Sequence, residues 1–297
     1  MESKILLENG TNEIEVLEFT IAGNSYGINV AKIREIINYQ PVTSVPNSHP
    51  SIEGIFMPRD TMITAIDLSN CLQRGESKPG GLFIVTNFNG LNVAFHVENV
   101  IGIHRVSWTQ IMKPENTLSG AEDGISTGIV NVDGKLIIIL DFEKIVADIN
   151  PETGIKISEI EEMGYRERNT IPLLLAEDSA LLNKLIKDSL VKAGYINVIS
   201  CENGQEAWDI LQEAKKKNNL DEVCRLLITD IEMPQMDGHR LLKLVRDDED
   251  TTHIPVVIFS SLVNEEMKRK GNALGASAQL SKPEIGNLVR VVDSLIK

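Results

Sequence analysis

The first half of the chain alternates hydrophobic and polar residues in short runs, a pattern typical of β-strands. Residues 16–21 and 26–30 are two such runs, and Gly23-Asn24 separates them. Asn89-Gly90 and Asp133-Gly134 each separate two further alternating runs and therefore predict two-residue hairpin turns. Many short strands at short spacing predict an all-β region built from barrels or a sandwich.

Two stretches of this half resemble each other. Residues 54–68 begin with Gly-Ile and end with Ile-Asp-Leu, and residues 128–142 begin with Gly-Ile and end with Leu-Asp-Phe. The earlier runs LEFTIAGNSYGINV and LFIVTNFNGLNVAF also correspond. The repeat predicts two related β-subdomains, and chance similarity between hairpins is the alternative.

The second half has a different pattern, in which uninterrupted apolar runs alternate with helical periodicity. Apolar runs of this kind suit a parallel sheet that is covered on both faces. Ser179 is a candidate helix cap, and helices are expected soon after each strand. The predicted strands are IPLLLAED and residues 198–199, 226–229, 256–259 and 279–280, and the later predicted helices are 205–216, 239–246, 265–274 and 285–296. The pattern predicts one doubly wound α/β domain.

Between the two halves lies a polar, acidic stretch. We therefore expect a β-rich domain over residues 12–150, a linker over 151–170 and an α/β domain over 171–297. A short helix is expected over residues 157–163, and the rest of the linker is expected to be an exposed connection.

Four chemically distinctive sites fall at the carboxyl ends of the predicted parallel strands, where ligands bind in such sheets. They are Glu177-Asp178, Asp230, Ser260-Ser261 and Lys282, which precedes Pro283. Clustered carboxylates suit Mg²⁺, and an aspartate can form an acyl phosphate while a lysine and a hydroxyl hold the phosphoryl oxygens. A single acid at a strand end is usually only solvated, so the prediction depends on the whole set.

The motifs LLLAEDS, LLITDIEMPQMDGHRL, IPVVIFSS and LSKPE resemble, in order and spacing, those of receiver domains of two-component signalling. The resemblance implies the flavodoxin-like strand order 2-1-3-4-5 and a Lys282–Pro283 bond that is cis in many relatives. It also implies roles for six residues: Asp230 as phosphoacceptor, Asp178, Asp230 and the main-chain carbonyl of Glu232 as Mg²⁺ ligands, Glu177 acting through water, and Ser260 and Lys282 as the family's hydroxyl and lysine.

The chain departs from this pattern at two positions. Gln279 stands where the family commonly has a switch aromatic, so an aromatic-gated relay is in doubt. Glu232 lies two residues after Asp230, where its charge is expected to alter the lifetime of the acyl phosphate.

Residues 12–150 resemble a CheW-type coupling module, which consists of two small β-barrel subdomains. The resemblance is carried by Tyr26-Gly27-Ile28, Ile33-Arg34-Glu35-Ile36 and residues 54–67. This family bridges the cytoplasmic tips of chemoreceptors and the histidine kinase CheA. Arg59 and Ile33 are candidates for a receptor-facing surface, with a solvated loop charge and a core residue as the respective alternatives. The family often has Arg-Gly where this chain has Arg59-Asp60.

A coupling module followed by a receiver is the order found in CheV-type proteins. The resemblance implies an adaptor, not an enzyme, that couples chemoreceptors to CheA and is modulated by phosphorylation of Asp230. A phosphate sink for CheA and an unphosphorylated structural adaptor are the alternatives. An aspartate-nucleophile phosphatase would usually have a second Asp where Glu232 stands, and a DNA-binding regulator would need an effector after Lys297.

Composition narrows the functional classes further. The formal net charge of -14 argues against broad nucleic-acid binding. The sequence contains no apolar run long enough to span a membrane and no signal-peptide pattern, so we expect a cytoplasmic protein, recruited to receptor arrays without membrane insertion. The three cysteines are expected to be reduced, and His96 and His104 lack metal-ligand spacing.

Overall fold

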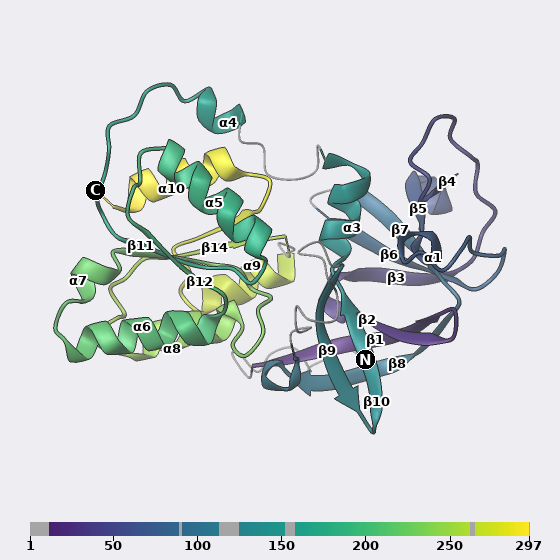
Figure 1. The fold of residues 1–297 in the computed structure, drawn as a ribbon, viewed down its shortest axis with the longest axis horizontal. Coiled ribbons are helices and arrows are strands. Elements are labelled where there is room, and N and C mark those ends of the chain that lie inside the picture. The colour runs from purple at the N-terminus through teal and green to yellow at the C-terminus, as the bar shows by residue number, and fades with distance from the viewer. Residues whose placement is uncertain (1–11, 89–90, 113–124, 152–157, 262–264, 297) are drawn as a thin grey trace. The chain divides into compact units, whose positions relative to one another are not determined.

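The computed structural model describes residues 12–88, 91–112, 125–151, 158–261 and 265–296. Two compact units make up the chain, namely Ile14–Thr153 and Gly154–Lys297 together with Met1–Glu13. Figure 1 labels their helices and strands. Among the described residues, no helix has the length and hydrophobicity needed to cross a membrane.

The first unit is built on two five-stranded sheets with the orders β8-β1-β2-β10-β9 and β3-β6-β7-β5-β4. The strands are β1 (Glu13–Ile21), β2 (Asn24–Asn29), β3 (Ile33–Asn38), β4 (Ile52–Phe56), β5 (Ile63–Asp67), β6 (Leu82–Phe88), β7 (Leu91–Val97), β8 (Asn99–Ser107), β9 (Ser126–Val132) and β10 (Lys135–Leu140). The short helices are η2 (Val30–Lys32), η3 (Pro58–Asp60), α1 (Leu68–Cys71), η4 (Trp108–Gln110) and α3 (Phe142–Ile149). The all-β prediction for this half is confirmed.

The predicted internal repeat is present in the pairing of the strands. In one sheet the hairpin β1–β2 pairs in parallel, through β2 and β10, with the hairpin β9–β10. In the other sheet the hairpin β6–β7 pairs in parallel, through β7 and β5, with the hairpin β4–β5. Asp67 and Asp141 then cap the helices that follow β5 and β10, each by accepting a backbone hydrogen bond three residues on.

Turn chemistry explains one of the two predicted hairpins. Asp133 and Gly134 have φ of 50° and 84°, the left-handed pair that a two-residue turn between β9 and β10 requires. β6 and β7 pair as predicted, but the turn residues Asn89 and Gly90 lie outside the described residues.

The second unit contains an all-parallel sheet with the order β12-β11-β13-β14-β15, so the predicted 2-1-3-4-5 order is confirmed. Its strands are β11 (Leu173–Ala176), β12 (Val198–Cys201), β13 (Leu226–Thr229), β14 (Val256–Ser260) and β15 (Ala278–Ser281). Its helices are α4 (Ser158–Glu161), α5 (Ala180–Lys192), α6 (Gly204–Lys216), α7 (Leu220–Val223), α8 (Gly238–Asp247), α9 (Glu265–Ala273) and α10 (Ile285–Leu295).

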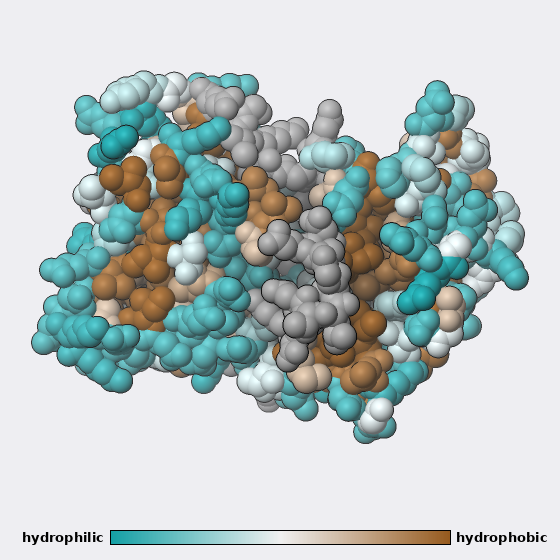
Figure 2. Space-filling view, in the orientation of Figure 1, coloured by the Kyte–Doolittle hydropathy of each residue, from teal (hydrophilic) through white to brown (hydrophobic). Residues whose placement is uncertain are grey.

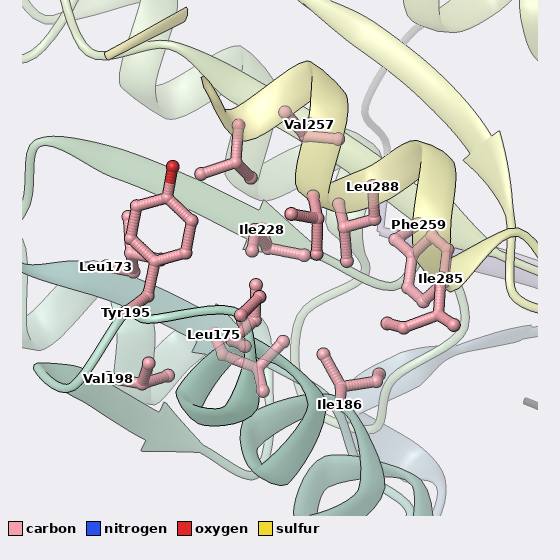
Figure 3. Packing of buried hydrophobic residues seen from close by; sticks show 14 of the residues in the cluster. Leu173, Leu175, Ile186, Tyr195, Val198, Ile228, Val257, Phe259, Ile285 and Leu288 are labelled. Atoms are coloured by element: carbon pink, nitrogen blue, oxygen red, sulfur yellow. The ribbon is translucent and has the colours of Figure 1, made fainter. Parts of the chain in front are cut away.

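Helices cover both faces of this sheet (Figure 1). Apolar residues of α5 and α10, including Ile186 and Leu288, pack with Leu175 and Phe259 of the strands in one buried cluster (Figure 3). α6 and α8 contact each other on the opposite face. Figure 2 shows hydrophilic residues over the outer side of α6, as its amphipathic sequence predicts.

Candidate functional site

The functional side chains follow the carboxyl ends of four parallel strands. Glu177 and Asp178 follow β11, Asp230 follows β13, Ser260 ends β14 and Lys282 follows β15. Because these strands are parallel and in one sheet, all four ends lie at the same edge. Carboxylate oxygens of Glu177, Asp178 and Asp230 come within 4.8 Å of one another, so the predicted clustering of the acids is confirmed.

We call the cluster of Glu177, Asp178 and Asp230 the acidic rim. Lys282 is a buried cation that contacts two of these acids. Its Nζ lies 2.7 Å from Asp230 Oδ2 and 3.1 Å from Glu177 Oε1. The Lys282 side chain is only 6% exposed, and those of Glu177 and Asp230 are 1% and 5% exposed. A buried lysine between two buried carboxylates is strongly held, because its removal would leave the charges of both carboxylates uncompensated.

Burial raises the pKa of Glu177 well above its usual range, and the charges of Asp230 and Asp178 add to that effect while Lys282 opposes it. Lys282 therefore offsets only part of the cost that burial and the neighbouring acids impose on ionised Glu177. Such a site gains from a further positive charge, since each carboxylate opposes the ionisation of its neighbours.

The residues fit a divalent cation. Glu177 Oε2 is buried and accepts no hydrogen bond, although Lys282 Nζ lies 3.1 Å away. The donor set consists of hard carboxylate oxygens from three residues, which is the ligand chemistry that Mg²⁺ prefers.

The backbone around Asp230 leaves no room for a side chain at Gly238. A Cβ atom at that position would overlap the carbonyl oxygen of Asp230, so the backbone approaches the acid closely only because residue 238 is glycine. The amide of Ile231 donates a hydrogen bond of 2.6 Å to Asp230 Oδ1, which orients the carboxylate. Glycine at the start of α8 thus permits the loop to fold back over the acid.

One supporting residue, Asn183, was not predicted from the sequence. The Asn183 side-chain amide donates to the carbonyl oxygens of Glu177 and Cys201, tying the ends of β11 and β12 to α5. The Ser179 amide donates to Glu177 Oε1, and its hydroxyl accepts from the Leu182 amide, which confirms Ser179 as the cap of α5. The signal for Asn183 was its position four residues after the cap.

The remaining predicted residues have distinct settings. Ser260 is buried, and its carbonyl oxygen accepts a 3.3 Å hydrogen bond from the Lys282 amide. Glu232 is half-buried in the loop after Asp230. The expectation of a cis Lys282–Pro283 bond was wrong: the described residues contain no cis peptide. The turn reaches the rim with a trans bond, held by the Ser260–Lys282 backbone contact.

Gln279 makes contacts that an aromatic switch residue could not. Its side-chain amide donates to the Lys268 carbonyl oxygen and to Asn272 Oδ1, both on α9. Gly271 makes space for it, because a Cβ there would overlap Gln279 Oε1. The Gln279 side chain therefore links β15 to α9 by two hydrogen bonds.

Arg59 and Ile33 belong to the first unit, and the two differ in exposure. The Arg59 side chain is 87% exposed and lies 3.7 Å from Glu35 Oε2, whereas Ile33 is half-buried against the hydrophobic core. Arg59 and Asp60 have φ of 52° and 63°, so Asp60 adopts the left-handed conformation that glycine, common here in the family, would adopt easily. All three cysteines are free, as predicted.

Comparison with known proteins agrees with both halves of this description. Residues 15–150 match the CheW-like domain, and residues 173–293 match the response regulator receiver domain. Chemotaxis protein CheV3 of Helicobacter pylori is 29% identical over 91% of this chain and 91% of its own length. The chain belongs to the CheV-type chemotaxis proteins. Chemotaxis protein CheV2 of the same organism is 27% identical over 92% of each protein, so the CheV-type architecture is shared along the chain.

The CheW-like half of this CheV-type chain has its own relatives. Chemotaxis protein CheW of Thermotoga maritima is 30% identical over 50% of this chain and 98% of that protein. A CheW-like coupling domain and a receiver domain in one polypeptide make the CheV-type chain a chemotaxis signalling adaptor.

Proposed function

We propose that the chain couples chemoreceptors to the histidine kinase CheA, and that CheA adjusts this coupling by phosphorylating Asp230. The observation that carries the proposal is the bridge that Lys282 Nζ makes between Asp230 and Glu177 within the acidic rim. A phosphoacceptor needs a nucleophilic carboxylate beside a fixed cation, and this arrangement supplies both. The adaptor is cytoplasmic and is recruited to membrane-associated receptor arrays.

In the proposed step, a carboxylate oxygen of Asp230 attacks the phosphorus of a phosphohistidine. The new O–P bond forms as the N–P bond breaks, and the imidazole leaves with the bonding electron pair and takes up a proton. Lys282, already 2.7 Å from Asp230, neutralises charge on the transferred group, and the Ser260 hydroxyl donates to one of its oxygens. The negative charge of the phosphoryl group attracts Lys282, and the resulting shift of this side chain changes the conformation of the receiver around it.

Asp178, Asp230 and the main-chain carbonyl of Glu232 would hold Mg²⁺, with Glu177 acting through water. When bound, this ion would neutralise the crowded carboxylates and the phosphoryl oxygens. The buried Glu177 Oε2, which accepts no hydrogen bond, supports this proposal, because a nearby cation would stabilise its charge.

Phosphotransfer from purified phospho-CheA tests the phosphorylation half of the proposal. We expect label on the wild-type chain in Mg²⁺, no label on Asp230→Ala, and wild-type labelling of Asp188→Ala, a control at an exposed aspartate on α5. Equal labelling of Asp230→Ala and the wild type would contradict the assignment. Absence of label on every protein would favour the unphosphorylated adaptor, and labelling without any effect on receptor control of CheA would favour the phosphate sink.

Reconstituted receptor–CheA assemblies test the coupling half. Arg59 is the better probe of the proposed receptor-facing surface, because its side chain is almost fully exposed and Ile33 also supports the core. We expect Arg59→Ala to reduce receptor control of CheA, and Arg74→Ala, at an exposed arginine of the same unit, to leave it unchanged. Identical behaviour of the two variants would remove Arg59 from the surface.

A further inference from the structure

The segment that precedes the receiver is packed onto it through the short helix α4. α4 contacts both α5 and α10. Ile160 is only 3% exposed and belongs to the receiver's buried cluster, and Met163 packs against the same cluster. The short helix predicted over residues 157–163 is present as α4, and the Ile160 side chain within it completes an apolar surface of the receiver.

Glu159 of this segment caps α10. Its Oε2 accepts a 3.1 Å hydrogen bond from the Gly286 amide in the first turn of that helix. The N-cap residue of α10, Glu284, makes no side-chain cap of its own and instead accepts from the Ser281 amide and the Asn287 side chain. A carboxylate at a helix N-terminus satisfies a free amide and complements the helix dipole. The linker therefore supplies a cap that α10 lacks locally.

Gly286 admits this contact. A Cβ atom there would lie 2.8 Å from Glu159 Oε2 and 3.4 Å from Glu159 Cβ. The absence of a side chain at Gly286 is what lets the linker approach the first turn of α10.

A second tether fixes the linker near the other end of α10. The Arg166 guanidinium pairs with both carboxylate oxygens of Asp293, and its Nε donates to the Ala193 carbonyl oxygen. The Tyr195 hydroxyl also donates to Asp293, which completes a network of three side chains. Two separate contacts therefore hold the linker along α10, and the Glu159 contact is the one beside the rim.

The capped turn of α10 is directly continuous with the rim. Gly286 follows Lys282 by four positions, and the residues between them form a tight turn in which the Glu284 amide donates to the Ser281 carbonyl oxygen at 2.8 Å. The Lys282 amide is bonded to Ser260 at the start of the same turn. If Lys282 moves toward a phosphoryl group on Asp230, it pulls on the short hydrogen-bonded turn that connects it to Gly286. That turn ends where Glu159 accepts the hydrogen bond of the Gly286 amide.

We propose that Glu159 is a positioning residue for the phosphoryl chemistry of Asp230: by capping α10 at Gly286, it fixes the turn that carries Lys282. This inference rests on the proposed phosphorylation of Asp230. At equilibrium the coupling is reciprocal, so a contact that phosphorylation loosens is one that opposes the phosphorylated state. The rate of labelling is a separate quantity, because there Glu159 acts by holding Lys282 beside Asp230 before the transfer. The linker is also the covalent connection to the CheW-like unit, and its release would be a direct output of the receiver.

The test compares Glu159→Ala, Glu159→Gln and the control Glu162→Ala, which removes an exposed acid from the same segment of the full chain. The rate of labelling by acetyl phosphate in Mg²⁺ is measured for each. We expect Glu159→Ala to label roughly two- to fivefold more slowly, which lies within the effect that loss of one helix cap can have, because Lys282 is less well fixed. Glu159→Gln keeps an oxygen acceptor for the Gly286 amide and should retain most of the rate, whereas Glu162→Ala should match the wild type.

Hydrogen exchange of the amides of residues 158–166 and 285–288 supplies a second readout. We expect faster exchange in the labelled wild-type chain than in the unlabelled one, and no such difference in Glu159→Ala, in which the contact is already lost. Suppose that the wild type is labelled, and that every variant has the same labelling rate and the same change in hydrogen exchange on labelling as the wild type. The positioning role of Glu159 is then overturned, while the proposed function stands. Equal slowing of Glu162→Ala and Glu159→Ala also overturns it. A wild-type chain that takes no label overturns the proposed function and this inference together.

Discussion

Two buried glutamates, one in each unit, show how differently the two halves treat a buried charge. Glu18 of the CheW-like unit uses both carboxylate oxygens: Oε1 accepts from Ser25 and Lys135, and Oε2 lies 2.8 Å from His104 Nε2. Glu177 of the receiver lies close to Asp178 and Asp230, shares Lys282 with Asp230, and has an Oε2 that accepts no hydrogen bond. Burial opposes the ionisation of Glu18, but these partners outweigh it and lower its pKa to about 2, whereas the pKa of Glu177 is raised.

Two buried histidines repeat the contrast. His96 of the CheW-like unit has Glu53 at one ring nitrogen and the Gly80 carbonyl oxygen at the other. His239 of the receiver is buried with Nε2 unbonded. Among the described residues, the three buried side-chain polar atoms without a hydrogen-bond partner belong to Glu177, Asn219 and His239, all of them in the receiver. Buried polar atoms that have hydrogen-bond partners stabilise a single conformation. Buried polar atoms without partners favour the binding of a ligand or a change of conformation that would supply one.

The largest expected difference between the two units is the effect on stability of removing one buried negative charge from each. Glu18→Gln should lower the free energy of unfolding of the CheW-like unit by about 2–3 kcal/mol near pH 7, because it weakens charged hydrogen bonds in a buried site. Since the folded pKa of Glu18 is depressed, this loss should shrink as pH falls below 4.5 toward about 2. Asp230→Asn should raise the stability of the receiver by about 1 kcal/mol without Mg²⁺, because it relieves repulsion in the rim.

The two tryptophans allow each unit to be followed separately by fluorescence during urea unfolding. Trp108 lies in the CheW-like unit and Trp208 in the receiver, so Trp208→Phe and Trp108→Phe backgrounds report the two units in turn. If Glu18→Gln and Asp230→Asn lost the same free energy of unfolding, the claimed difference between the two units in how they stabilise a buried carboxylate would be wrong.

The pH dependence of the receiver should follow His239. Burial, with a smaller contribution from Lys270, lowers the pKa of His239 from 6.5 to about 3, so the unfolded chain binds the proton more readily. Receiver stability should therefore fall as pH decreases through 6.5, by at most about 1.4 kcal/mol per pH unit from this group. Urea midpoints at several pH values, read from Trp208, would show this slope. His239→Leu should remove it and His253→Gln, at an exposed histidine, should keep it; the same slope in His239→Leu would refute the assignment.

The CheW-like unit should respond to pH in the opposite direction. Burial opposes protonation of His96, but the Glu53 carboxylate and the Gly80 carbonyl oxygen outweigh it and raise the pKa. The stability from this pair is complete below 6.5 and is lost as pH rises through the folded pKa. Urea midpoints read from Trp108 should therefore fall on the alkaline side in the wild type, and His96→Gln should show a flatter dependence. An unchanged alkaline slope in that variant would show that the buried pair does not titrate as described.

The smallest expected effect concerns Glu232. Its carboxylate, two residues after Asp230, opposes the approach of an attacking water to a phosphoryl group that is already negative. Glu232→Asn should speed loss of label from the chain roughly two- to threefold, and Glu222→Gln, an exposed acid on α7, should not. Decay of label after removal of the donor measures both rates, and identical decay of Glu232→Asn and wild type would exclude a role for the charge.

The rim could be predicted from the sequence because its residues occupy strand ends, and parallel strands bring those ends together. The same was true of the Ser179 cap and the Asp133-Gly134 turn, which depend on local chemistry, whereas the strand order followed from the resemblance to receiver domains. The linker contacts could not be predicted in this way. Glu159 meets Gly286 and Arg166 meets Asp293 across 127 residues in each case, and no local pattern specifies such a partner.

Glu18 was missed for a related reason. In an alternating strand it reads as an ordinary solvent-facing residue, but Ser25, His104 and Lys135 come from three other strands and bury it. Its burial is a property of the assembled sheet. The trans Lys282–Pro283 bond and the hydrogen bonds of Gln279 to α9 likewise depend on surroundings that only the folded chain supplies.

Peptide mapping of the full-length chain after treatment with acetyl phosphate tests the central claim most directly. The account predicts one acyl phosphate, carried by the peptide that contains Asp230, formed in Mg²⁺ and strongly reduced by a chelator or by Lys282→Ala. A phosphoryl group on a different residue, or formation that is indifferent to both Mg²⁺ and Lys282, would contradict it.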